Sequence, residues 1–126
     1  MKEECKAKVT ISTIKGYANG AYKAGYNFDQ FTAILQEIEE KNFSATSVSW
    51  LAYQGKTIYK REWGAPTGGE EVFILEADYT EYDRKCISVQ DWKNRILEHA
   101  EFLREWFGQS TVRVTFIESV ETIILR

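Results

Sequence analysis

The chain has 126 residues, a formal net charge of −3 and a single histidine, with 44% hydrophobic, 14% aromatic and 28% charged residues. This composition is typical of one globular domain that can bury enough apolar surface to fold without a metal or a disulfide. It excludes intrinsic disorder, and because no apolar run exceeds four residues it predicts neither a signal peptide nor a membrane span.

The acidic residues concentrate in the middle of the chain. Residues 1–27 carry five lysines against two acids, residues 28–82 carry four basic residues against ten acids, and residues 83–126 are balanced. A nucleic-acid partner is therefore not expected, because phosphate binding needs clustered lysine and arginine. Cys5 and Cys86 match no zinc-binding spacing, so they are predicted to be reduced thiols of a cytoplasmic protein, with a single disulfide as the alternative. No cofactor is predicted.

The first third of the chain predicts a strand, a long loop and a helix. Residues 8–14 are rich in β-branched side chains, which is typical of a strand. Residues 16–26 contain three glycines and three tyrosines and should form a long loop or a short helix. A helix should then begin at Asn27 or Asp29 and end near Lys41. Its apolar stripe is Phe28, Phe31, Ile34, Leu35 and Ile38, with Gln36, Glu37, Glu39 and Glu40 expected on the opposite face.

The middle of the chain predicts three antiparallel strands in succession. Residues 43–54 form the first, Gln54-Gly55 the hairpin turn, and residues 56–63 a half-exposed edge strand. Residues 64–69 hold the only proline and three glycines and connect to a central strand at residues 70–82. One face of this strand should be core (Phe73, Leu75, Ala77, Tyr79) and the other solvated (Val72, Ile74, Glu76, Asp78, Thr80).

The last third predicts a helix and a strand. Ser88 is the expected N-cap of a helix that runs to about Phe107 and stops at Gly108, followed by a strand at residues 111–116 that the last residues continue. The element order is thus β-α-β-β-β-α-β. It predicts an α+β domain with a mostly antiparallel sheet of about five strands and two helices packed on one face. The single histidine, His99, borders the stripe of the second helix and is expected to be half-buried and hydrogen-bonded to the sheet.

Two known folds share part of this order. The segment αβββα resembles a double-stranded-RNA-binding domain, but the start of its second helix, SVQDWKNR, lacks the basic cluster that straddles phosphates. The order αβββαβ resembles the PD-(D/E)xK nucleases in topology. In that comparison Glu76 and Asp78 would hold a divalent metal, with Lys60 or Glu62 assisting, although Asp78 stands where the lysine of the motif is required.

The glycine- and tyrosine-rich loop is the segment most suggestive of binding. Tyrosine offers a large contact area at low entropic cost, and Tyr17, Tyr22, Lys23 and Tyr26 could contact a protein or stack on single-stranded nucleic acid. Tyr59 and Trp63 share one face of the predicted edge strand, and if that face is open they form an exposed aromatic patch, a second contact surface on the sheet.

We therefore predict a small non-enzymatic protein-binding module of the accessory, inhibitor or immunity type, acting by steric contact. A divalent-metal-dependent nuclease or phosphoesterase using Glu76 and Asp78, and single-stranded nucleic-acid binding, are the alternatives. The expected partner is another protein, and the unpaired edge at residues 56–63 could support a homodimer.

Overall fold

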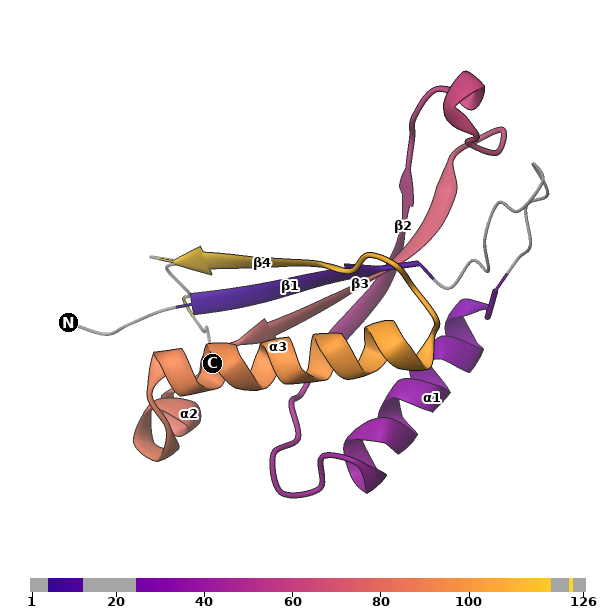
Figure 1. Ribbon diagram of the computed structural model, residues 1–126. Coiled ribbons are helices and arrows are strands. Elements are labelled where there is room, and N and C mark those ends of the chain that lie inside the picture. Colours follow the sequence, from indigo (N-terminus) through magenta and orange to yellow (C-terminus); the bar gives the residue numbers. More distant parts are fainter. Residues whose placement is uncertain (1–4, 13–24, 119–122, 124–126) are drawn as a thin grey trace.

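The computed structural model of the chain describes residues 5–12, 25–118 and 123. In this part of the chain four strands form one antiparallel sheet, accompanied by three α-helices and one short 3₁₀ turn (Figure 1). In chain order the elements are β1 (Cys5–Ile11), α1 (Phe28–Lys41), β2 (Leu51–Thr57), η2 (Arg61–Trp63), β3 (Glu70–Asp78), α2 (Glu81–Cys86), α3 (Val89–Trp106) and β4 (Arg113–Glu118).

The sheet has the strand order β2-β3-β1-β4, so β1 and β3 are central. Val9 of β1 lies between Leu75 of β3 and Val114 of β4, and this register aligns the inward side chains of the three strands. The helices α1 and α3 lie on the same face of the sheet, and the β2-β3 hairpin extends beyond them (Figure 1). The predicted α+β class, the antiparallel sheet and the packing of helices on one face are confirmed.

The core lies between the sheet and the two long helices. Alternate residues of β1 and β3 point into it because successive side chains of a strand face opposite ways. Phe31 of α1 stacks on Phe73 of β3 with ring centroids 4.5 Å apart. Burying each large apolar side chain contributes about 1.5–3 kcal/mol. The largest fully buried side chains are Phe31, Ile11, Leu75, Ile96, Leu103, His99 and Val9.

Side-chain caps fix the starts of both long helices. Asn27 accepts a hydrogen bond from the Gln30 amide, and the Gln30 side chain accepts one from the Asn27 amide, so Asn27 rather than Asp29 is the N-cap of α1. Ser88 accepts from the Asp91 amide at the start of α3, as predicted. Among the helices of the described residues, none is long and apolar enough to cross a lipid bilayer.

The region between α1 and β3 differs from the prediction. Residues 43–50 are irregular, and a single strand, β2, replaces the two predicted strands and their turn. Gly55 lies inside β2 opposite Val72, and a Cβ there would come 2.9 Å from the Ile74 side chain. This glycine therefore accommodates a cross-strand neighbour instead of forming a turn. The merging of two predicted strands into one explains why the sheet has four strands in the described residues and not about five.

Two other boundaries also moved, and one helix was not predicted. β1 begins at Cys5, three residues earlier than predicted, because Cys5 and Ala7 continue the buried alternation. The predicted central strand ends at Asp78, and the helix α2 follows within what was predicted as strand and loop. Thr80 caps α2 by accepting from the Asp83 amide, while the Asp83 carboxylate accepts from the Thr80 amide. A capping box thus overrides the continuing alternation of the strand.

Candidate functional site

Of the four predicted binding residues in the glycine- and tyrosine-rich loop, the structure describes Tyr26 alone. Tyr17, Tyr22 and Lys23 lie outside the described residues. Tyr26 is half-buried and packs against the end of α3, with ring centroids 6.0 Å from Trp106 and 5.7 Å from Phe107. It therefore contributes to the rim of the core.

The other predicted binding residues lie at the tip of the β2-β3 hairpin. Trp63 of η2 is 68% exposed, and the Lys60 ammonium lies 5.2 Å from its ring centroid. Tyr59 is half-buried, and its hydroxyl donates a hydrogen bond to Glu70 at 3.0 Å. These residues follow β2 and do not share a strand face, so the predicted aromatic patch reduces to one exposed tryptophan.

Glu76 and Asp78 lie on the face of β3 opposite the helices, as predicted. Asp78 pairs with Lys6 of β1 at 3.4 Å. Lys60 and Glu62, which were expected to assist the metal site, form an ion pair with each other at 3.6 Å. They follow Thr57, which pairs with Glu70 at the start of β3, whereas Asp78 is at its other end. Within residues 5–12, 25–118 and 123, no three His, Cys, Asp or Glu side chains are close enough to hold a metal ion. The structure therefore does not bring the proposed metal site together.

The single histidine is buried in a polar cluster between α1 and α3. His99 is 2% exposed, and its Nδ1 donates to the carbonyl oxygen of Arg95 at 2.7 Å. Its Nε2 lies 2.9 Å from a carboxylate oxygen of Glu39, and its ring stacks on Phe43 with centroids 3.8 Å apart. The expectation of a half-buried histidine bonded to the sheet is wrong, because its partner is a carboxylate from α1.

Glu39 is the residue that sequence reasoning placed on the wrong side of α1. It is only 8% exposed, although it was expected to face water. The signal was available: Glu39 follows Phe31 by eight residues and Leu35 by four, so it lies on the apolar stripe of the helix. A carboxylate buried at such a position needs hydrogen-bond partners.

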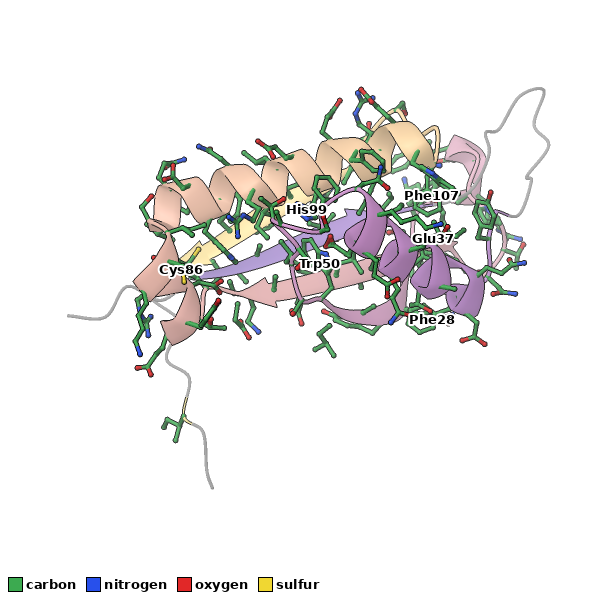
Figure 2. The ribbon with its side chains drawn as sticks, turned by 90° about the horizontal axis from the view of Figure 1, so that it is seen from below. Phe28, Glu37, Trp50, Cys86, His99 and Phe107 are labelled. Atoms are coloured by element: carbon green, nitrogen blue, oxygen red, sulfur yellow. The ribbon has the colours of Figure 1, made fainter. Side chains whose placement is uncertain are left out.

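The carboxylate of Glu39 holds the connection between α1 and β2, residues 42–50, which we call the strap. Its Oε1 accepts from the indole N–H of Trp50 at 2.6 Å and from the amide of Val48 at 3.3 Å. The ring of Trp50, at the end of the strap, lies next to that of His99 on α3, with ring centroids 6.2 Å apart (Figure 2). This bonding draws the strap toward α1 and explains why residues 43–50 do not pair with β3.

A cleft of about 550 Å³ opens where the strap leaves the sheet. That volume lies within the range of small-molecule sites, about 300–1,000 Å³. Three parts of the chain form it: the strap with the first residue of β2, the end of β3 with α2, and the first turns of α3. Its lining residues are Ser47, Val48, Ser49, Trp50, Leu51, Glu76, Ala77, Asp78, Thr80, Tyr82, Asp83, Trp92 and Arg95.

The cleft contains three carboxylates against one guanidinium, that of Arg95, together with three aromatic side chains. Tyr82 is 76% exposed, whereas Trp92 is buried. Tyr53, on the outer face of β2, lies beside the cleft carboxylate Glu76, and burial together with this negative charge raises the pKa of its phenol. Lys6 offsets one of the three carboxylates, that of Asp78, which leaves three negative groups against two positive ones, and this balance still favours a cationic ligand.

The edge of β3 contributes main-chain groups to the cleft. The β2-β3 ladder ends at the pair Leu51 and Glu76. The Tyr79 amide donates to Cys5 of β1 at 2.9 Å, and main-chain groups alternate in direction along a strand. The N–H and C=O of Asp78 therefore point away from β1, toward the side that β2 has left. One donor and one acceptor are thus side by side in the cleft.

The fold is similar to that of a known enzyme. No protein-family model matches the chain, and no curated protein matches its sequence. A phage SAM lyase in complex with S-methyl-5′-thioadenosine aligns with a TM-score of 0.57 and 18% identity, covering 91% of this chain and 81% of that chain. The same kind of protein, phage SAM lyase in its apo state, aligns with a TM-score of 0.54 and 15% identity over 90% of this chain and 79% of that chain. At these identities the likeness establishes the fold.

This finding corrects the function predicted from the sequence. The predicted function was a non-enzymatic protein-binding module, with a metal-dependent nuclease and single-stranded nucleic-acid binding as alternatives. The solved structures that share the fold over nine tenths of the chain are those of a lyase, one of them with a small molecule bound. The prediction of a non-enzymatic, protein-binding module is therefore wrong, and the likeness supports neither alternative.

Proposed function

We propose that the protein is an S-adenosylmethionine lyase that binds the adenosyl part of its substrate in the cleft beside β3 and releases S-methyl-5′-thioadenosine. The observation that carries this proposal is the fold shared with a phage SAM lyase holding that thioether, over 91% of this chain. The chemistry of the cleft supports it independently, through its aromatic side chains, its charge and its main-chain groups.

The first support is a fit to adenine. Tyr82 and Trp50 line the cleft, and stacking of a base on an aromatic side chain is worth about 1–3 kcal/mol. Adenine presents an amino donor next to a ring-nitrogen acceptor. The neighbouring C=O and N–H of Asp78 are the complementary pair, and no side chain is needed for this contact.

The second support is the charge of the cleft. S-Adenosylmethionine carries a positive sulfonium and an amino-acid end with one ammonium and one carboxylate, so its net charge is positive. Even with Lys6 counted against Asp78, the carboxylates of the cleft outnumber the basic groups, which favours such a ligand over a nucleotide phosphate. Glu76 is suited to the sulfonium or the ammonium, and Arg95 to the carboxylate, which a guanidinium binds in a bidentate manner.

The reaction sets a limited task for the protein. Release of methylthioadenosine requires cleavage of the bond between sulfur and the four-carbon aminoacyl chain, with the electron pair passing to sulfur. As this bond breaks, the carbon chain either closes onto its own carboxylate to give a lactone or gives up a proton from the neighbouring carbon to a base such as the carboxylate of Glu76. Because the sulfonium becomes a neutral thioether as the bond breaks, the protein has to orient the substrate and to limit the access of water.

Calorimetric titration with S-methyl-5′-thioadenosine tests the binding site. Tyr82→Ala should weaken binding by about 1–3 kcal/mol without lowering the melting temperature, since Tyr82 is 76% exposed. Glu76→Gln should weaken the binding of S-adenosylmethionine more than that of the neutral thioether. Glu71→Gln is the matched control, because Glu71 is exposed on the same strand outside the cleft. No binding to the wild type, or equal effects of the two glutamine variants, would refute the proposed site.

The compartment and the partners remain predictions. The exposed thiol of Cys86 and the buried thiol of Cys5 are both free, which suits the reducing cytoplasm that we propose for the protein. The predicted edge at residues 56–63 lies on the outer strand of the sheet only at its first two residues, Lys56 and Thr57, so a homodimer through it would rest on β2 itself.

A further inference from the structure

The buried pair Glu39 and His99 requires one more hydrogen than a carboxylate and a neutral imidazole supply. Nδ1 of His99 carries a hydrogen, because its partner, the Arg95 carbonyl, can only accept. In a neutral ring Nε2 would then be an acceptor, facing an acceptor oxygen of Glu39 at 2.9 Å, and neither atom has another partner in the described part of the chain. A proton held between these two atoms resolves the conflict, on either the ring or the carboxyl.

This arrangement leaves the other oxygen of Glu39 free of the histidine and dedicated to the strap. Oε1 accepts hydrogen bonds from the indole N–H of Trp50 and the amide of Val48, and both residues line the cleft. The shared proton therefore fixes the direction of the carboxylate, and the carboxylate fixes the wall of the cleft.

The strap depends on these bonds because it separates two open spaces. The cleft lies on one side of residues 48–50, and a groove of about 670 Å³ between the strap and α1 lies on the other. The three strap residues Val48, Ser49 and Trp50 line both spaces. Phe43, Val48 and Trp50 pack against the core, and where residues 48–50 have open space on two sides the bonds to Glu39 add to this packing in fixing their position.

We propose that Glu39 is a positioning residue for the cleft: paired with His99, it holds Trp50 and the strap where they bind the adenosyl ligand. The ligand part of this proposal rests on the proposed function. The anchoring part does not, since it concerns bonds within the chain. Because the strap is displaced rather than removed when the anchor is lost, Glu39→Ala should weaken the binding of methylthioadenosine about tenfold to a hundredfold.

Glu39→Gln is the decisive comparison. The amide oxygen of glutamine can still accept from Trp50 and Val48, and its amino group can donate to the free Nε2 of a neutral His99. Every hydrogen bond is thus kept without a shared proton, so this variant should bind within about threefold of the wild type. Rescue by glutamine but not by alanine would show that the bonds to the strap are what matters.

Two controls separate positioning from general loss of stability. Glu40→Ala removes an exposed carboxylate next to Glu39 and should change nothing. Ile38→Ala removes a buried side chain from the same turn of α1 and should lower the melting temperature while leaving ligand affinity intact below the transition. If Glu39→Ala lowers the melting temperature but binds methylthioadenosine as tightly as Ile38→Ala does, the positioning role is overturned.

A second measurement needs no ligand and no alanine variant. The indole N–H of Trp50, identified by its loss in Trp50→Phe, should exchange with deuterium more slowly than that of the exposed Trp63 in both the wild type and Glu39→Gln. Exchange as fast as that of Trp63 would overturn the anchor. If the wild type binds no methylthioadenosine, the proposed function fails and the exchange rates alone decide whether Glu39 anchors the strap.

Discussion

Replacing His99 by phenylalanine should strongly destabilise the protein, although the new ring nearly matches the old in shape. The stack on Phe43 and the contact with Trp50 would survive, since both are made by the face and edge of the ring. The change removes the two ring nitrogens, which bond the Arg95 carbonyl and the Glu39 carboxylate. The Glu39 carboxylate would then stay buried, and its Oε2 would have lost its partner, Nε2 of His99.

The size of the effect follows from burial. The side chains of His99 and Glu39 are 2% and 11% exposed, so solvent does little to screen their interaction. Removing one member of such a pair typically costs about 3–5 kcal/mol. Adding Glu39→Gln to His99→Phe should recover about 1–3 kcal/mol, because a neutral amide is cheaper to bury than a carboxylate that lacks a partner.

Urea unfolding at neutral pH measures both the loss of stability in His99→Phe and its partial recovery in the double variant. The dependence of the unfolding free energy on urea concentration should be the same in all variants, so that differences in the midpoint report differences in stability. A double-mutant cycle of the two variants isolates their coupling. The reasoning would be refuted by a His99→Phe variant within about 1 kcal/mol of the wild type, or by a double variant no more stable than His99→Phe alone.

Three further outcomes are expected. Burial raises the pKa of the Cys5 thiol, so in the native protein a thiol reagent at neutral pH should modify the exposed Cys86 and leave Cys5 unmodified until unfolding; equal rates for the two thiols would contradict this. Gly69→Ala should lower the free energy of unfolding by more than about 1 kcal/mol, measured by thermal unfolding. The reason is that φ is +93° at Gly69 and a Cβ there would lie 2.8 Å from the carbonyl oxygen of Thr57 on the paired strand. Tyr79→Phe should cost about 1 kcal/mol by the same method, since its hydroxyl donates to the Ile87 carbonyl at 2.6 Å, and an unchanged midpoint would count against that bond.

The fold was largely predictable because its signals are local. The alternation in β3, the capping residues Asn27 and Ser88, and the helical stripes each lie within a few residues of one another. The hairpin was not predictable in the same way. Gly55 has the local character of a turn, and only its contact with Ile74 across the strands shows that it belongs inside β2.

The candidate site was missed because it depends on that same region. The cleft exists because β2 starts late and leaves the end of β3 uncovered, and this in turn depends on Glu39 holding the strap. Glu39 and His99 are sixty positions apart, and no local pattern connects them. Glu76 and Asp78 were considered from the sequence only as metal ligands. Two residues that line the cleft with them, Tyr82 and Arg95, come from a helix that was not predicted and from the helix after it.

The most direct test of the proposed function is incubation of the purified protein with S-adenosylmethionine, followed by chromatography of the adenine-containing products. The wild type should produce S-methyl-5′-thioadenosine above the rate of spontaneous breakdown, Glu76→Gln should produce less, and Glu71→Gln should match the wild type. Formation of methylthioadenosine at only the spontaneous rate, by a protein shown to be folded, would contradict the assignment as a lyase.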